Sequence, residues 1–134
     1  MENFAKFLEN TREPNIDPIK IAIIDDGLDA TVPKLQNAIA LGKSFSPYPN
    51  STEFMKAYFV PSGRHGTLMA TLVQKICPKP QLYIARLEER STAGGRARFT
   101  ATSAKEVCNS PIYRFISILF LPSATTRTKE DAGQ

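Results

Sequence analysis

The sequence has little histidine, little cysteine and no long hydrophobic run, and each shortage excludes a class of protein. No stretch reaches the about 18 consecutive apolar residues that a membrane-spanning helix needs. The first residues include Glu2 and Glu9 and have no long apolar core, so they are not typical of a secretory signal. We therefore expect a soluble cytoplasmic protein without a membrane partner.

The cysteines and the single histidine are too few for a structural zinc site. Cys77 and Cys108 lie outside any CxxC pair, and His65 is the only histidine of the chain. In a reducing compartment both cysteines are expected to remain thiols. The sequence predicts neither a metal site nor a cofactor.

The charge of the chain is mildly basic and scattered. Its 134 residues include 17 Lys and Arg against 13 Asp and Glu, which gives a net charge of +4. No five basic residues are consecutive, so they are typical of a solvated surface and do not predict a nucleic-acid partner. The length fits one domain with a modest core and leaves the oligomeric state open.

The pattern of apolar residues predicts alternating strands and helices. Amphipathic spacing predicts helices at 3–11, 32–41, 66–76 and 100–107. Pro33 begins the second of these, Gly42 ends it, and Pro78 stops the third. Apolar runs predict strands at 19–24, 81–87 and 115–122, with a further short strand at 55–60.

This order of elements predicts an α/β fold with a mostly parallel sheet. We expect an N-terminal helix or extension over 1–17, a domain over 18–122 and a polar tail over 123–134. Surface loops are expected at 43–64 and 88–98. Sites in such folds form beyond the carboxyl ends of the strands.

Two short motifs hold residues with catalytic chemistry. Asp25 follows the apolar run 19–24, so its carboxylate is partly desolvated and needs a partner. The alternative is that Asp25 or Asp26 only caps a turn or the next helix. His65 precedes the helix 66–76, whose dipole disfavours an imidazolium and leaves a neutral ring able to act as a general base. The alternative is a surface histidine without a role.

The residues around Asp25 read Ile23-Ile24-Asp25-Asp26-Gly27-Leu28, and those around His65 read His65-Gly66-Thr67-Leu68-Met69-Ala70. These segments resemble the motifs around the catalytic aspartate and histidine of the subtilisin-like serine proteases, or subtilases. Asp29, Pro33 and the segment 77–89 are also similar to that family. The resemblance covers residues 18–106.

The resemblance implies a three-layer subtilisin-like fold and serine-type endopeptidase activity on a protein or peptide substrate. It implies that Asp25 accepts a hydrogen bond from Nδ1–H of His65, and that Nε2 of His65 takes a proton from a serine. The order of the family's triad is Asp, His, Ser. Asp26 would shape the turn without joining the triad.

The serine of that triad has no counterpart, and neither has the family's oxyanion-hole asparagine. Ser103 lies in Ala-Thr-Ser-Ala-Lys-Glu, which lacks the family's glycine and proline and comes too early. The chain is also shorter than a complete domain of this family. We therefore expect an incomplete N-terminal part, inactive alone, with an unpaired sheet edge, a partly uncovered His65 helix and poor solubility.

Two other functions stay open. The stretch KIAIIDDG also resembles the start of a phosphoacceptor receiver domain, in which paired acidic residues hold magnesium. However, such a domain needs a third, phosphorylated carboxylate at the end of a later strand. The segment 81–89 reaches its glutamates only after Arg86 and Leu87, 55–62 has no aspartate, and His65 stays unexplained. The other function is binding of a peptide without cleavage, because extended peptides add to exposed strand edges.

Overall fold

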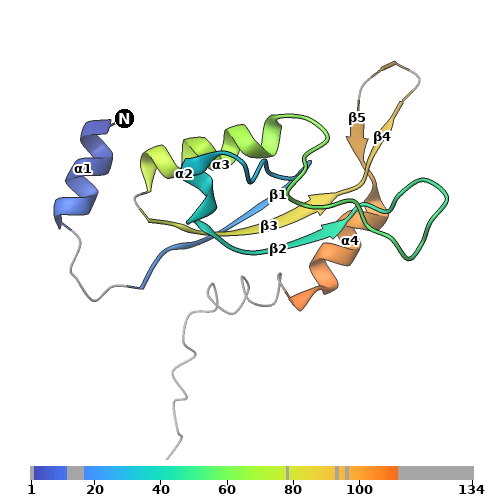
Figure 1. Cartoon of the computed structure of the whole chain (residues 1–134), viewed down its shortest axis with the longest axis horizontal. Helices are drawn as coiled ribbons and strands as arrows, with labels where there is room; N and C mark the ends of the chain where they lie inside the picture. The colour runs from blue at the N-terminus through green and yellow to red at the C-terminus, as the bar shows by residue number, and fades with distance from the viewer. Residues whose placement is uncertain (1, 12–16, 78, 93, 96, 112–134) are drawn as a thin grey trace, which may run out of the picture.

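The computed structural model describes residues 2–11, 17–77, 79–92, 94–95 and 97–111, which form a sheet with helices on both faces (Figure 1). The three strands of the sheet are parallel and have the order β1-β3-β2. They are β1 (Lys20–Asp25), β2 (Ile39–Phe45) and β3 (Gln81–Leu87). The predicted α/β class with a parallel sheet is therefore confirmed.

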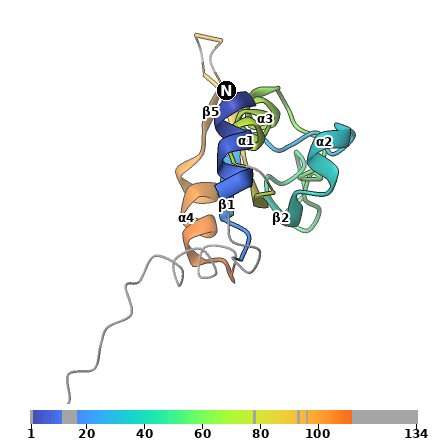
Figure 2. The same ribbon diagram turned by 90° about the vertical axis from the view of Figure 1, so that its left-hand side faces the viewer.

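Two helices cover one face of the sheet, and a third helix lies on the opposite face. α2 (Pro33–Gln36) and α3 (His65–Ile76) lie above the sheet in Figure 1, and α4 (Ala101–Asn109) lies below it. Figure 2 shows the same separation from the side. The larger core, under α2 and α3, consists of Ile23, Leu28, Leu35, Ala38, Ala70, Leu82 and Ile84. The smaller core, against α4, consists of Phe45, Ala85, Leu87 and Val107.

β3 is apolar along most of its length because it contributes to both cores. Successive side chains of a strand point to opposite faces, so Leu82 and Ile84 enter the larger core while Ala85 and Leu87 enter the smaller one. This explains why QLYIARL shows no polar alternation. The exception is Arg86, which is also buried.

The second predicted helix is wrong in its extent. Residues 32–41 do not form one helix: α2 stops at Gln36, and β2 already begins at Ile39. The apolar spacing of this stretch also suits a strand, and the backbone pairs with β3 in parallel register. Gly42 lies inside β2, where a Cβ would come within 2.2 Å of the Tyr58 ring, so it makes room for that ring and does not end a helix.

The remaining predicted elements are confirmed in part. α1 (Glu2–Thr11) and α4 match the expected helices, and Thr100 caps α4 by accepting the N–H of Ser103 at 3.3 Å. The loop 88–98 contains an antiparallel hairpin, β4 (Glu89–Ser91) with β5 (Ala97–Phe99). In place of a strand at 55–60, the structure has an isolated bridge from Met55 to Pro47.

Some predictions fall outside the part of the chain that the structure describes. These are the strand at 115–122 and the tail at 123–134. Within the described part, no helix combines the length and the apolar character needed to cross a bilayer. Cys77 and Cys108 are not joined to each other by a disulfide.

Candidate active site

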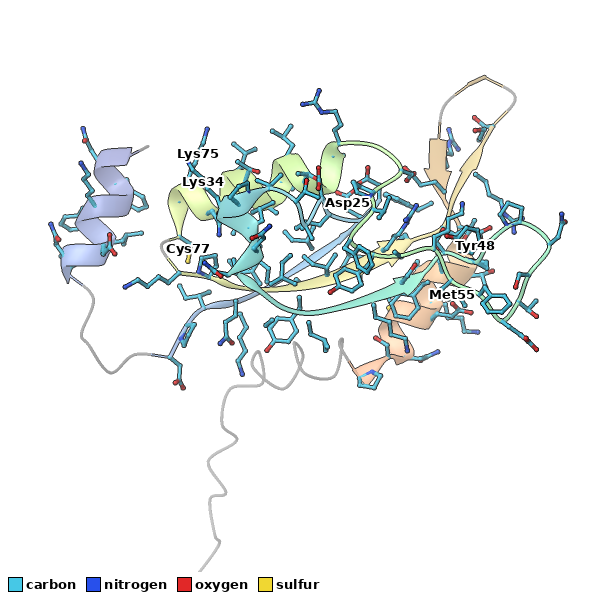
Figure 3. All side chains as sticks on the ribbon, in the orientation of Figure 1. Asp25, Lys34, Tyr48, Met55, Lys75 and Cys77 are labelled. Carbon is cyan, nitrogen blue, oxygen red and sulfur yellow. The ribbon has the colours of Figure 1, made fainter. Side chains whose placement is uncertain are left out.

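The structure brings the two predicted catalytic residues into contact. Asp25 is the last residue of β1, and His65 is the first residue of α3. Nδ1 of His65 lies 2.5 Å from Oδ2 of Asp25, although the two residues are 40 positions apart in the chain. Oδ1 of Asp25 accepts the N–H of Asp26 at 2.8 Å, which fixes the carboxylate from its other side. Figure 3 shows Asp25 near the start of α3.

The two partners differ in their exposure to solvent. The side chain of Asp25 is 11% exposed, whereas that of His65 is 69% exposed. A buried carboxylate beside an exposed imidazole holds one ring nitrogen and leaves Nε2 to meet another molecule. This is the arrangement that a general base needs.

The pKa of His65 is shifted in the direction opposite to the sequence-based expectation. The hydrogen bond that His65 makes to the Asp25 carboxylate raises the pKa of His65, and the negative charges of Asp25 and Asp26 raise it further. The prediction of a ring kept neutral by the helix dipole is therefore wrong in direction. A carboxylate in direct contact outweighs the partial charge of a helix end.

Asp26 caps the N-terminal end of α3. Its carboxylate is buried, and Oδ1 accepts the N–H of Gly66 at 2.7 Å. The first N–H groups of a helix have no partner within the helix, and an anion there also favours the helix dipole. Asp26 therefore caps α3 while Asp25 binds His65. The alternative was a cap of a turn or of the next helix, whereas the helix that Asp26 caps is a later one.

Gly66 and Thr67 bring the helix close to the turn after β1. A Cβ on Gly66 would lie 2.1 Å from the carbonyl oxygen of Gly27, a distance that no side chain tolerates. Oγ1 of Thr67 accepts the N–H of Asp29 at 2.9 Å. The turn itself needs a glycine, because Gly27 has φ of +108°. Each residue of His-Gly-Thr thus has its own contact with this turn.

Ser103 does not meet His65. It lies in α4, on the opposite face of the sheet from α3, and it is buried. Its hydroxyl donates to the carbonyl of Thr100 at 3.0 Å and accepts the N–H of Glu88 at 3.2 Å. These contacts give Ser103 a structural role at the start of α4.

Sequence reasoning missed the contribution of Arg86. This residue is only 5% exposed, and its Nη1 donates to the carbonyl oxygens of Ala57 at 2.7 Å and Val60 at 2.5 Å. Burial lowers its pKa. The available signal was an arginine within an otherwise apolar strand, since buried charged groups occur where specific contacts hold them.

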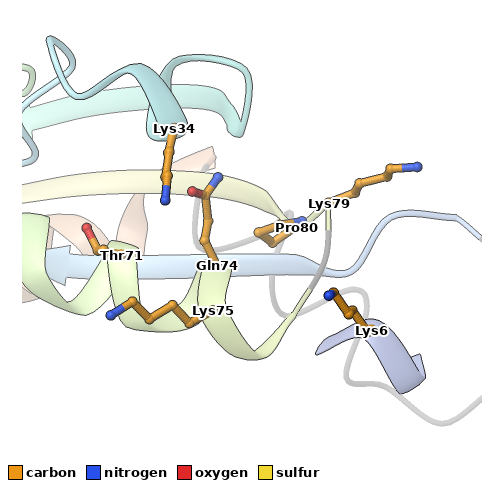
Figure 4. A pocket seen from close by; sticks show the side chains of 7 residues that line it. All are labelled: Lys6, Lys34, Thr71, Gln74, Lys75, Lys79 and Pro80. Carbon is orange, nitrogen blue, oxygen red and sulfur yellow. The ribbon is translucent and has the colours of Figure 1, made fainter. Parts of the chain in front are cut away.

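Other parts of the described structure do not form a second catalytic group. Among these residues, no group of three or more His, Cys, Asp and Glu side chains could hold a metal ion. A cavity of about 660 Å³ lies near the other end of α3, lined by Lys6, Lys34, Thr71, Gln74, Lys75, Lys79 and Pro80. In Figure 4, Lys34 and Gln74 point toward each other while Lys79 points outward, so the lysines do not converge on one point.

The chain was compared with protein-family models, with curated proteins and with solved structures, and no match was found in any of them. The likeness to subtilases therefore depends on the two motifs and on the geometry of the residues that they contain. The relation to that family stays a proposal.

Proposed function

We propose that Asp25 and His65 are the acid–base pair of a serine-type endopeptidase of the subtilisin-like kind. The observation that carries this proposal is the 2.5 Å contact between Nδ1 of His65 and Oδ2 of Asp25. The buried carboxylate, the exposed ring and the position at the carboxyl end of a parallel sheet support it. The three-layer subtilisin-like fold is proposed on the same grounds.

In the proposed reaction, Asp25 holds the tautomer of His65 that has its proton on Nδ1. Nε2 then takes the proton of a serine hydroxyl as the hydroxyl oxygen attacks the peptide carbonyl, and later gives this proton to the leaving amine. Asp25 stabilises the imidazolium formed between these steps. Because the pKa of His65 is raised, the basic form is populated only above that pKa, so the rate increases as the pH rises through it.

The serine of the triad has no counterpart in this sequence, and Ser103 lies on the opposite face of the sheet from α3, so the chain alone is expected to be inactive. Loss of the serine from subtilisin lowers turnover about 10⁶-fold. At about 1.4 kcal/mol per tenfold change, this corresponds to about 8 kcal/mol of barrier. The purified chain should therefore hydrolyse casein no faster than a blank.

The experiment that tests the proposal is done on the native protein. An antibody against residues 43–64 measures its size relative to the 14.8 kDa of this chain, and the captured protein is then treated with a fluorophosphonate probe for activated serines. We expect the captured protein to be labelled, and the labelling to be lost in His65→Ala. Lys75→Ala, at the other end of α3, is the matched control and should keep its labelling rate. Labelling that persists unchanged in His65→Ala would contradict the proposal.

The second candidate function is binding of an extended peptide without cleavage. It is favoured by the edges of the sheet, because the described strands place no partner on the outer side of β1 or of β2. A peptide can pair with such an edge through its backbone. This function predicts that a native protein near 14.8 kDa binds unfolded peptides in a fluorescence anisotropy assay and hydrolyses none of them.

A further inference from the structure

Arg86 lies beside the candidate site, at the carboxyl end of the central strand. It is the register partner of Asp25 across β1 and β3, so the two side chains leave the same face of the sheet, the face that α3 covers. A Cβ on Gly27 would lie 3.5 Å from Cδ of Arg86, which places the arginine stem under the turn after β1. Burying a guanidinium is costly unless its N–H groups are bonded.

One nitrogen of Arg86 bonds two backbone carbonyls. Nη1 donates to the carbonyl oxygens of both Ala57 and Val60, while the buried Nε has no hydrogen-bond partner in the described structure. An arginine selected to bind a carboxylate would present two nitrogens in a fork. Here the charge is used to hold two backbone carbonyls of the loop that leads to His65.

That loop is in turn bonded to the turn after β1. The carbonyl of Tyr58 accepts the N–H of Leu28 at 2.9 Å, and the N–H of Ser62 donates to the carbonyl of Asp26 at 3.2 Å. A Cβ on Gly63 would lie 2.7 Å from Oδ2 of Asp26. The chain reaches His65 two residues later. The loop 57–63 therefore sets how α3 begins relative to the end of β1.

We propose that Arg86 is a positioning residue: by holding the carbonyls of Ala57 and Val60, it fixes the loop that places His65 against Asp25. That this positioning of His65 serves catalysis rests on the proposed function. The positioning itself is a property of the folded chain and is measured without a substrate.

The test replaces Arg86 with Met and with Lys and follows His65, the single histidine, by NMR titration of the whole chain. Methionine and lysine have similar unbranched stems, but only the lysine ammonium donates hydrogen bonds, and its one nitrogen can serve both carbonyls. We expect the pKa of His65 to fall toward its ordinary value in Arg86→Met and to stay at the wild-type value in Arg86→Lys.

The direction of the change separates positioning from simple electrostatics. Removing a nearby positive charge favours an imidazolium, so a purely electrostatic role would raise the pKa of His65 in Arg86→Met. The control Arg90→Met removes an exposed arginine that bonds Glu88, and it should leave the pKa of His65 unchanged.

An unchanged or raised pKa of His65 in a folded Arg86→Met variant would overturn the proposal. If Arg86→Met does not fold, Arg86→Lys decides: a wild-type pKa supports the proposal, and an ordinary histidine pKa in the folded variant overturns it. None of these results depends on hydrolysis. If the titration fits but the native protein is not labelled by the serine probe, only the proposed protease function is lost.

Discussion

The two ends of α3 are held in different ways. At the first end, His65, Gly66 and Thr67 contact the turn after β1 at distances of 2.5, 2.7 and 2.9 Å. At the last end, Lys75 and Ile76 are exposed beside the lysine-lined cavity. Among the described residues, the first end has three hydrogen bonds to the turn after β1, and this is the end that carries the candidate base. Further along, α3 packs Ala70 and Val73 against the larger core.

The largest effect is expected from Gly66→Ala. The new methyl group would lie 2.1 Å from a backbone oxygen, so α3 must move away from the turn. We expect a loss of about 1–3 kcal/mol in the free energy of unfolding, measured by urea denaturation. Gly94→Ala is the control, because its Cβ would meet nothing within 4 Å, and it should change stability by less than about 0.5 kcal/mol. Equal stabilities of the two variants would remove the distinction between the ends of α3.

A smaller effect is expected from Thr67→Val. Valine has the shape of threonine but cannot accept the N–H of Asp29, so this partly buried donor loses its partner. The free energy of unfolding should fall by about 1 kcal/mol. Thr71→Val is the matched control one turn later, since its hydroxyl only donates to a carbonyl within the helix, that of Thr67. A larger loss in Thr71→Val than in Thr67→Val would contradict this assignment.

The pH dependence of stability should report on the contact between His65 and Asp25. Because the pKa of His65 is raised in the folded state, protonated His65 stabilises the fold, and this stabilisation is fully present below the unfolded pKa of about 6.5. It is lost as the pH rises through the folded pKa. Asp25 and Asp26 are the charged groups that raise this pKa, so Asp25→Asn should flatten the profile over this range. The free energy of unfolding of the wild type and of Asp25→Asn is measured by urea denaturation at a series of pH values. The same dependence on pH in both proteins would contradict the pairing of His65 with Asp25.

The smallest change in stability is expected at the exposed end of α3. Ile76 is 46% exposed, so Ile76→Lys should alter the free energy of unfolding by less than about 0.5 kcal/mol. Leu68 and Met69 are also exposed, at 56% and 39%, which confirms the expected incomplete cover of this helix. The substitution should therefore raise the solubility of the purified chain, measured by light scattering. A strongly destabilised Ile76→Lys would show that this end is held as firmly as the other.

The sequence was most informative where the local pattern of residues reflects burial or a required close contact. The strand at 81–87 is apolar because it is buried, and a pattern of burial can be read directly. The apolar run at 19–24 was also correctly predicted to form a strand, although only its Ile23 is buried and Ile24 is exposed. Asp25 and His65 were expected to pair because their two motifs resemble those of the subtilases; their places beside a strand and a helix left other roles open for each. At Gly66, the lack of a side chain is required by one close approach.

The sequence was least informative where the deciding partner is distant backbone. The stretch 39–45 forms a strand because β3, more than one element later, supplies the pairing edge. The role of Arg86 could not be predicted for the same reason. Its partners are the backbone carbonyls of Ala57 and Val60, and every residue type has such a carbonyl. The direction of the pKa shift of His65 could not be predicted either, because it depends on the short distance to Asp25, which outweighs the helix dipole.

The strand order β1-β3-β2 has a consequence for how the protein is made. β1 and β2 leave the ribosome first, yet within the part of the chain that the structure describes each of them pairs with β3 alone. Lys20 pairs with Gln81, and Ile39 pairs with Leu82. Such long-range parallel pairing is slow to form, since a long loop must close before any contact rewards it. During synthesis the two strands therefore present unpaired edges for as long as β3 is missing. This interval is when the nascent chain most needs protection by a chaperone.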